Sequence, residues 1–151
     1  MLLFVMGLDN MREIKFRAKA GTQWRYGDLY HNERGELMIY EPLTKGKTLD
    51  GAAVLGWRLK VDPETVGQYT GLKDSGGREI YEDDIVRVVH YGEESIHVIK
   101  YCDDMDYPAF DLWPHFDCES NGLSFCECER ETTITVIGNA HDNPELLERM
   151  I

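Results

Sequence analysis

Hydrophobic and polar residues alternate in several short segments of the chain, and this alternation predicts β-strands. In segment 12–20, three apolar residues alternate with three basic ones, which are Ile14, Phe16 and Ala18 against Lys15, Arg17 and Lys19. Because the side chains of a strand point alternately to its two faces, this segment is predicted to be a half-buried strand with a basic outer face.

Similar short runs, separated by turn residues, predict further strands along the chain. These strand candidates are 24–31, 37–40, 66–72, 85–91, 95–102, 109–113, 123–128 and 132–137. Turns recur about every 8–12 residues, which favours antiparallel strands in a barrel or a sandwich. The chain is therefore predicted to be mainly β.

Helix signals are confined to two short segments. Asp62 before Pro63 has the cap and first-turn residues of one helical turn, and Asn143 before Pro144 predicts a short C-terminal helix. Region 72–80, which contains a strong turn, is the only candidate boundary. We expect an N-terminal antiparallel β region over residues 11–78 and a small barrel with the terminal helix over residues 79–151.

The composition indicates a folded, acidic chain. Apolar residues make up 42% of its 151 residues, and its formal net charge is -12. An acidic surface repels the phosphates of nucleic acids, which disfavours general nucleic-acid binding. No run approaches the roughly 20 apolar residues that span a bilayer, so no membrane association is expected.

The apolar start of the chain is a poor signal peptide, because no basic residue precedes it and no small-residue cleavage site follows. Met11 directly precedes the first patterned segment, so residues 1–10 are interpreted as a non-native or disordered extension. Together these features predict a cytoplasmic protein.

Three blocks of sequence resemble the YopX family, whose members are encoded by phages and prophages. The blocks are MREIKFRA at 11–18, VGQYTGLKD at 66–74 with GREIYE at 77–82, and VIGN at 136–139 with NPEL at 143–146. The resemblance implies a phage or prophage protein in a bacterial host, and a β-rich fold with an SH3-like barrel in its C-terminal half. It implies no established activity, cofactor or catalytic residue.

One departure from the family pattern concerns the entry to the barrel. The family usually has Gly-Asp where this chain has Asp83 and Asp84. A glycine would allow a positive φ, which Asp tolerates better than most residues. If the backbone turns there, we expect Asp83 to cost a little stability; its carboxylate could instead point outward as part of a partner surface.

Three late cysteines and one histidine form the strongest metal-like group in the sequence. They are His115, Cys118, Cys126 and Cys128. Three thiolates and an imidazole could hold a tetrahedral zinc ion, although the common Cys-x2-Cys spacing is missing. Unlinked thiols in a reducing compartment are the preferred interpretation, and no cofactor is expected.

No catalytic motif is recognisable in the chain. No Ser or Cys stands in a nucleophile elbow, and the glycines lack the order of a phosphate-binding loop. His90, His97 and His141 are scattered over predicted strands and a loop. The acidic groups at 82–84 and 103–106 are interpreted as solvated loops, since they lack the spacing of a calcium loop. We therefore expect a protein that is not an enzyme.

The remaining functional signal is an aromatic and acidic surface. The residues expected to contribute to it are Trp24, Tyr26, Tyr69, Tyr81, Asp83 and Asp84. The first hypothesis is a non-catalytic protein-interaction module that binds a host or phage protein and forms a homo-oligomer through open strand edges. The alternative is a nucleic-acid-linked accessory or DNA-mimic protein in phage replication or host control. It rests on the basic face of segment 12–20 with nearby Arg25, or on the acidic surface as a mimic of DNA.

Overall fold

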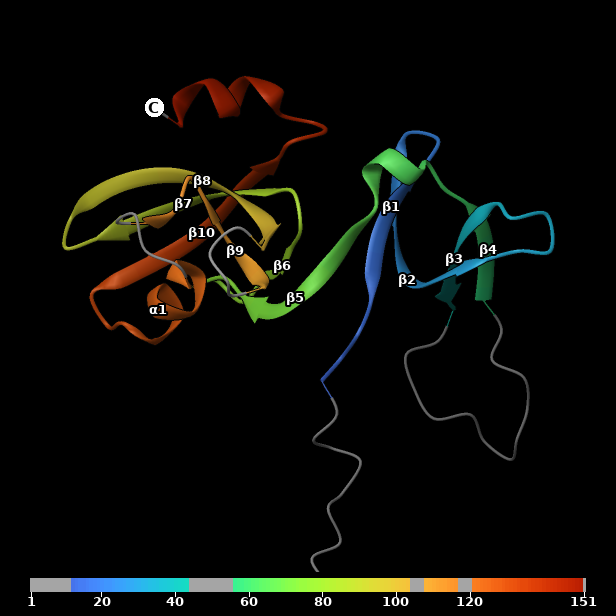
Figure 1. Cartoon of the computed structure of the whole chain (residues 1–151), viewed down its shortest axis with the longest axis horizontal. Coiled ribbons are helices and arrows are strands. Elements are labelled where there is room, and N and C mark those ends of the chain that lie inside the picture. Colours follow the sequence, from blue (N-terminus) through green and yellow to red (C-terminus); the bar gives the residue numbers. More distant parts are fainter. Residues whose placement is uncertain (1–11, 44–55, 104–107, 117–120, 151) are drawn as a thin grey trace, which may run out of the picture.

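The structure, a computed structural model, describes residues 12–43, 56–103, 108–116 and 121–150. Within these ranges the chain is mainly β, with two antiparallel sheets and one short α-helix (Figure 1). This confirms the predicted fold class. None of the helices in these ranges has the length and apolar character needed to cross a membrane. The predicted extension at residues 1–10 lies outside the described residues.

The first sheet has six strands in the order β4-β3-β2-β1-β5-β6. The strands are β1 (Phe16–Ala20), β2 (Gln23–His31), β3 (Leu37–Pro42), β4 (Gly56–Lys60), β5 (Gly67–Lys73) and β6 (Glu79–Tyr81). The predicted helical turn is the 3-10 helix η3 (Pro63–Thr65), where the Asp62 side chain accepts a hydrogen bond from the Glu64 N–H. Figure 1 shows β5 running from beside β1 toward the second sheet.

The second sheet has four strands in the order β10-β7-β8-β9. They are β7 (Asp84–His90), β8 (Glu93–Cys102), β9 (Ala109–Trp113) and β10 (Thr132–Asn139), with helix α1 (Gly122–Cys128) between β9 and β10 in the chain. The predicted terminal helix is the 3-10 helix η5 (Pro144–Arg149). The described strands pair as an open sheet with β9 and β10 at its edges, rather than as a closed SH3-like barrel.

Two hydrophobic cores support the sheets. The larger one, between the second sheet and α1, contains Ile80, Val86, Val88, Ile99, Leu112, Phe116, Leu123, Cys126, Ile134 and Val136. The smaller one, in the first sheet, is built on Ala18, Ile39 and Val61. Strand β6 pairs with β5 but places Ile80 in the larger core. Strand β6 therefore contacts both the first sheet and the larger core, close to the predicted boundary between residues 78 and 79.

A buried ion pair joins the two sheets. Arg17 Nη1 on β1 lies 2.7 Å from Asp84 Oδ1 on β7, and both side chains are almost fully buried. Arg17 Nη2 also donates to the Glu82 carbonyl oxygen at 3.1 Å. Asp84 Oδ2 accepts from the backbone N–H of Tyr81 at 2.8 Å. Arg17 is therefore buried, although the alternation assigns it to the polar face of its strand.

The predicted strand 123–128 is wrong, because this segment forms α1. The Asp111 carboxylate on β9 accepts hydrogen bonds from the backbone N–H groups of Asn121 and Leu123, at 2.6 and 2.9 Å. The helix has no capping hydrogen bond from the side chain of its own N-cap residue. Leu123 and Cys126, three residues apart, both pack into the core. A short apolar run does not distinguish a helix from a strand, so this contact with β9 decides the outcome.

Candidate functional site

A cleft of about 850 Å³ opens on the six-stranded sheet beside β2. The ladder between β1 and β2 ends at the pair Phe16–Gly27, and the cleft lies where that pairing stops. Its walls come from segment 13–15, from β2 at 26–28 with the end of β3, and from β6. Residues far apart in the sequence thus line one hollow.

Gly27 allows β2 and β3 to approach closely in the wall of this cleft. β2 pairs with β1 up to Gly27 and with β3 from Asp28 onward. A Cβ at position 27 would lie 1.9 Å from the backbone carbonyl oxygen of Tyr40 on β3. Any other residue would force β3 away from β2 and so change the shape of the cleft.

Four carboxylates and one ammonium group line the cleft, which makes it acidic. The acids are Glu13, Asp28, Glu41 and Glu79, and the base is Lys15. Lys15 Nζ lies 2.9 Å from Glu13 and 2.6 Å from Glu79. Burial opposes ionisation of Glu79, but hydrogen bonds from Lys15 and Tyr81 outweigh it and lower the pKa of this carboxyl group. Glu79 is therefore a stable negative charge at neutral pH.

Tyrosines in mutual contact form and support the aromatic part of the cleft. The exposed ring of Tyr26 meets Tyr81 edge-on, with 5.6 Å between ring centroids, and Tyr81 packs against Tyr69 at 5.5 Å. The Tyr81 hydroxyl donates to Glu79 Oε2 at 2.9 Å. Burial and this neighbouring carboxylate raise the pKa of Tyr81, so the phenol stays protonated. Tyr26 thus has a rigid support and one open side.

The structure does not gather the six predicted partner-surface residues on one exposed face. Tyr69, Tyr81 and Asp84 are buried, which corrects the expectation that they face a partner. The Trp24 Nε1–H donates to Asp142 Oδ2 at 2.6 Å. Tyr26 combines substantial exposure with a place in the acidic cleft.

Asp83, the last of the six, lies against the C-terminal part of the chain. Its Oδ2 is 3.0 Å from His141 Nε2, and its φ is 65°. The backbone therefore does turn with a positive φ where the family usually has glycine. The carboxylate is held in an internal contact with the segment after β10.

Each member of the predicted basic face pairs with a carboxylate. Lys15 bridges two glutamates, Arg17 pairs with Asp84, Lys19 with Asp142, and Arg25 with Glu41. Hydrogen bonds from Lys19, Trp24 and Asn139 lower the pKa of Asp142. Because each positive charge is locally balanced, these residues do not form a free basic patch.

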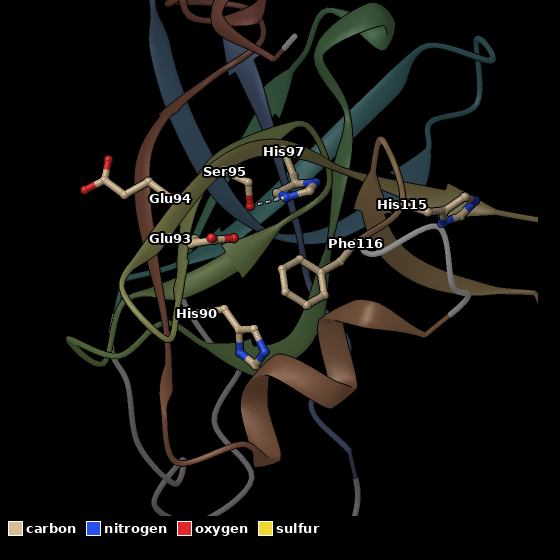
Figure 2. Close-up of a pocket in the computed structure, with 7 residues that line it drawn as sticks. All are labelled: His90, Glu93, Glu94, Ser95, His97, His115 and Phe116. Carbon is tan, nitrogen blue, oxygen red and sulfur yellow. Dashed lines mark hydrogen bonds between the residues drawn. The ribbon is translucent and has the colours of Figure 1, made fainter.

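A second hollow, of about 280 Å³, lies beside β8 and is shown in Figure 2. Three histidines and two glutamates are among its lining residues. Figure 2 shows Ser95 and His97 directed toward each other, whereas the ring of His115 points away from them. The ring of His90 lies edge-on to Phe116, with 5.4 Å between centroids, and its Nδ1 is 2.6 Å from Thr132 Oγ1.

Ser95 and His97 form a contact that was not predicted from the sequence. Ser95 Oγ lies 2.8 Å from His97 Nε2, and His97 Nδ1 lies 2.6 Å from the Pro114 carbonyl oxygen. Their spacing could have indicated this contact, because residues two apart in a strand lie on the same face. His97 is therefore not the isolated histidine expected from the sequence: it has a hydroxyl partner and a buried ring.

Among the described residues, the structure gives no support to the zinc cluster. Residues two apart on a helix point in nearly opposite directions; accordingly, Cys126 is buried and Cys128 is exposed. His115 Nδ1 lies 3.6 Å from Asp111 Oδ2. Cys118 lies outside the described residues. In the part of the chain that the structure covers, no three His, Cys, Asp or Glu side chains are grouped to hold a metal ion.

Comparison with known proteins gives a family match and similar folds. The family model described as YopX protein matches residues 15–148. The crystal structure of protein YopX from Bacillus subtilis has a TM-score of 0.52 and 18% identity, covering 88% of this chain and 95% of that one. A protein from Enterococcus faecalis has a TM-score of 0.46 and 24% identity, with 91% and 99% covered. No curated protein matches. At these identities the first structure supports the fold alone.

Proposed function

The chain belongs to the YopX family, and we propose that it is a protein-interaction module whose cleft binds a basic segment of a partner protein, without chemistry at that cleft. The observation that carries this proposal is the exposed ring of Tyr26 surrounded by carboxylates in a hollow of about 850 Å³. An aromatic face and nearby carboxylates together recognise lysine and arginine side chains.

Charge complementarity favours a basic partner. The cleft has four acidic residues against Lys15, which is already bridged to two of them. The whole chain has a formal net charge of -12. Opposite charge on a partner would steer its approach and raise the association rate.

The nucleic-acid alternative has less support. Direct binding of phosphates needs free cations, whereas Lys15, Arg17, Lys19 and Arg25 each pair with carboxylates. A DNA mimic would also use an acidic surface, because its carboxylates replace phosphates in the binding site of a DNA-binding protein. The hollow with its tyrosine suits the insertion of a single side chain better than it suits a protein that contacts a row of phosphates.

Calorimetric titration with a synthetic peptide of seven arginines tests the proposal. Asp28→Lys reverses a charge in the cleft, and we expect it to weaken binding about tenfold at low salt. Tyr26→Ala should weaken binding about threefold, through loss of the cation–π contact. Glu33→Lys makes the same charge change at an exposed hairpin residue outside the cleft and should leave the affinity within about twofold.

Equal losses for Asp28→Lys and Glu33→Lys would show that the peptide senses only the total charge, and would contradict a specific cleft. Absence of binding to the wild-type protein at low salt would contradict it as well. A peptide of seven glutamates serves as the ligand control and should not bind.

A further inference from the structure

Ser95 and His97 stand on the same face of β8, and their hydrogen bonds define the state of the imidazole. His97 Nδ1 is 2.6 Å from the Pro114 carbonyl oxygen, which can only accept. The neutral ring therefore carries its proton on Nδ1. Nε2, 2.8 Å from Ser95 Oγ, then accepts the hydroxyl proton of Ser95. Ser95 Oγ thus faces the lone pair of a base.

Burial keeps this base in its neutral form. His97 is only 5% exposed, and desolvation lowers its pKa, although the Pro114 carbonyl and the charge of Asp111 act in the opposite direction. The neutral ring is the form that can take a proton from Ser95. A nucleophile, a base and a third group that orients the base are the arrangement needed for covalent catalysis.

Small molecules can reach the pair from two sides. Ser95 and His97 line the hollow of about 280 Å³ together with Phe116. They also line a neighbouring hollow of about 320 Å³, to which Arg149 of η5 contributes. Arg149 is exposed and brings a positive charge to the same hollow as Ser95. Hollows of this size suit small ligands rather than long chains.

We propose that Ser95 is a nucleophile that is acylated by small carboxylic esters, with His97 as its general base and Arg149 as the charge that stabilises the oxyanion. The site lies on the four-stranded sheet, apart from the acidic cleft. It goes beyond the protein-interaction function and does not depend on it.

The acylation step needs only groups that the chain and the ester supply. Ser95 Oγ bonds to the carbonyl carbon while its proton passes to His97 Nε2. The carbonyl electron pair moves onto oxygen, where Arg149 stabilises the negative charge. When that pair returns, the bond to the leaving oxygen breaks, and the proton on His97 passes to the departing alcohol. Water, activated by His97 in the same way, then releases the carboxylic acid and restores Ser95.

Labelling of the full-length protein with a fluorescent fluorophosphonate tests the nucleophile directly. Mass spectrometry of the digested protein should place the label on Ser95. Ser95→Ala should abolish the label, and His97→Gln should slow labelling at least tenfold. Ser124→Ala, which removes an exposed serine on α1, is the matched control and should label at the wild-type rate.

Turnover of p-nitrophenyl acetate tests the reaction. Arg149→Gln should slow release of nitrophenol at least tenfold, as expected for loss of an oxyanion-stabilising group. The wild-type labelling rate should fall at acidic pH, because the protonated ring cannot accept the serine proton, and burial places this fall below the ordinary pKa of histidine. The other titratable or charged groups that line the two hollows or act on the ring are His90, Glu93, Glu94, Asp111, His115 and Arg149.

The proposal is overturned if folded wild-type protein takes no label on Ser95 at pH 8. It is also overturned if folded His97→Gln labels as fast as wild type, since the imidazole would then be only a structural link to Pro114. Thermal melting of each variant shows whether it is folded. If His97→Gln does not fold, the pH profile of the wild-type protein decides, and a labelling rate that does not fall at any acidic pH at which the protein stays folded contradicts the role of His97.

Discussion

At the scale of single residues, Asp83 holds a backbone conformation that most side chains avoid. Its φ of 65° lies in the left-handed region. Its N–H donates to the Ile99 carbonyl, and its own carbonyl accepts from Ala140 N–H. These two hydrogen bonds fix the entry to β7. The sequence correctly identified this position, from a departure in a family pattern, but it could not supply the contact with His141.

Substitutions at Asp83 separate the backbone effect from the side-chain effect. Asp83→Ala should lower the free energy of unfolding by about 1–2 kcal/mol, because alanine tolerates a positive φ less well and the contact with His141 is lost. Asp83→Gly should stay within about 1 kcal/mol of wild type, since relief of backbone strain offsets that loss. Urea unfolding measures both. His141→Ala removes the contact alone; if Asp83→Gly loses as much stability as Asp83→Ala, backbone strain is not the cause.

At the scale of elements, the strands follow the sequence pattern more closely than α1 does. The runs 85–91 and 95–102 form the paired strands β7 and β8, as their alternation and the intervening turn predict. The segment 123–128 forms a helix because Asp111, more than ten residues earlier, accepts hydrogen bonds at its start. Local patterns do not contain such a contact.

The two candidate sites also depend on contacts between distant parts of the chain. The walls of the cleft come from residues as distant as Glu13 and Glu79, so only the folded sheet assembles them. Tyr26 was predicted from composition, but its acidic neighbours were not. Ser95 and His97 carried a local signal, because both lie in one predicted strand, yet the partner that orients His97 is the distant Pro114 carbonyl.

Asp111→Ala tests the account of α1. The carboxylate is 4% exposed and accepts from three backbone N–H groups, those of Leu112, Asn121 and Leu123. Its removal leaves these donors without their partner and should lower the free energy of unfolding by about 2–4 kcal/mol. Hydrogen exchange should be faster at Leu123. The exposed Asp103 provides the control, and Asp103→Ala should change stability by less than about 0.5 kcal/mol. Equal effects of the two substitutions would contradict the role of Asp111.

At the scale of the whole molecule, opposite charges are used to join parts of the chain. The pair Arg17–Asp84 links the two sheets, and Lys19 links β1 to Asp142 after β10. Because Arg17 and Lys19 are paired with carboxylates, the remaining acidic residues determine the charge of the surface. This arrangement supports a basic partner for the molecule more than a nucleic acid.

We also propose that the molecule associates with a second copy through its open sheet edges. Among the described strands, β4 and β9 each lie at one edge of a sheet and carry an exposed tryptophan, Trp57 and Trp113. Open edges can pair with a second copy. Homo-oligomer formation through these edges is a proposal in addition to the binding of a basic segment.

The most direct test of the cleft is an NMR titration of ¹⁵N-labelled protein with the peptide of seven arginines. If the cleft binds the peptide, the largest amide shifts should cluster at Lys15, Tyr26, Asp28 and Glu41, and in Asp28→Lys these shifts should need about tenfold more peptide to develop. Shifts spread evenly over the acidic residues of both sheets, or centred away from β2, would contradict it.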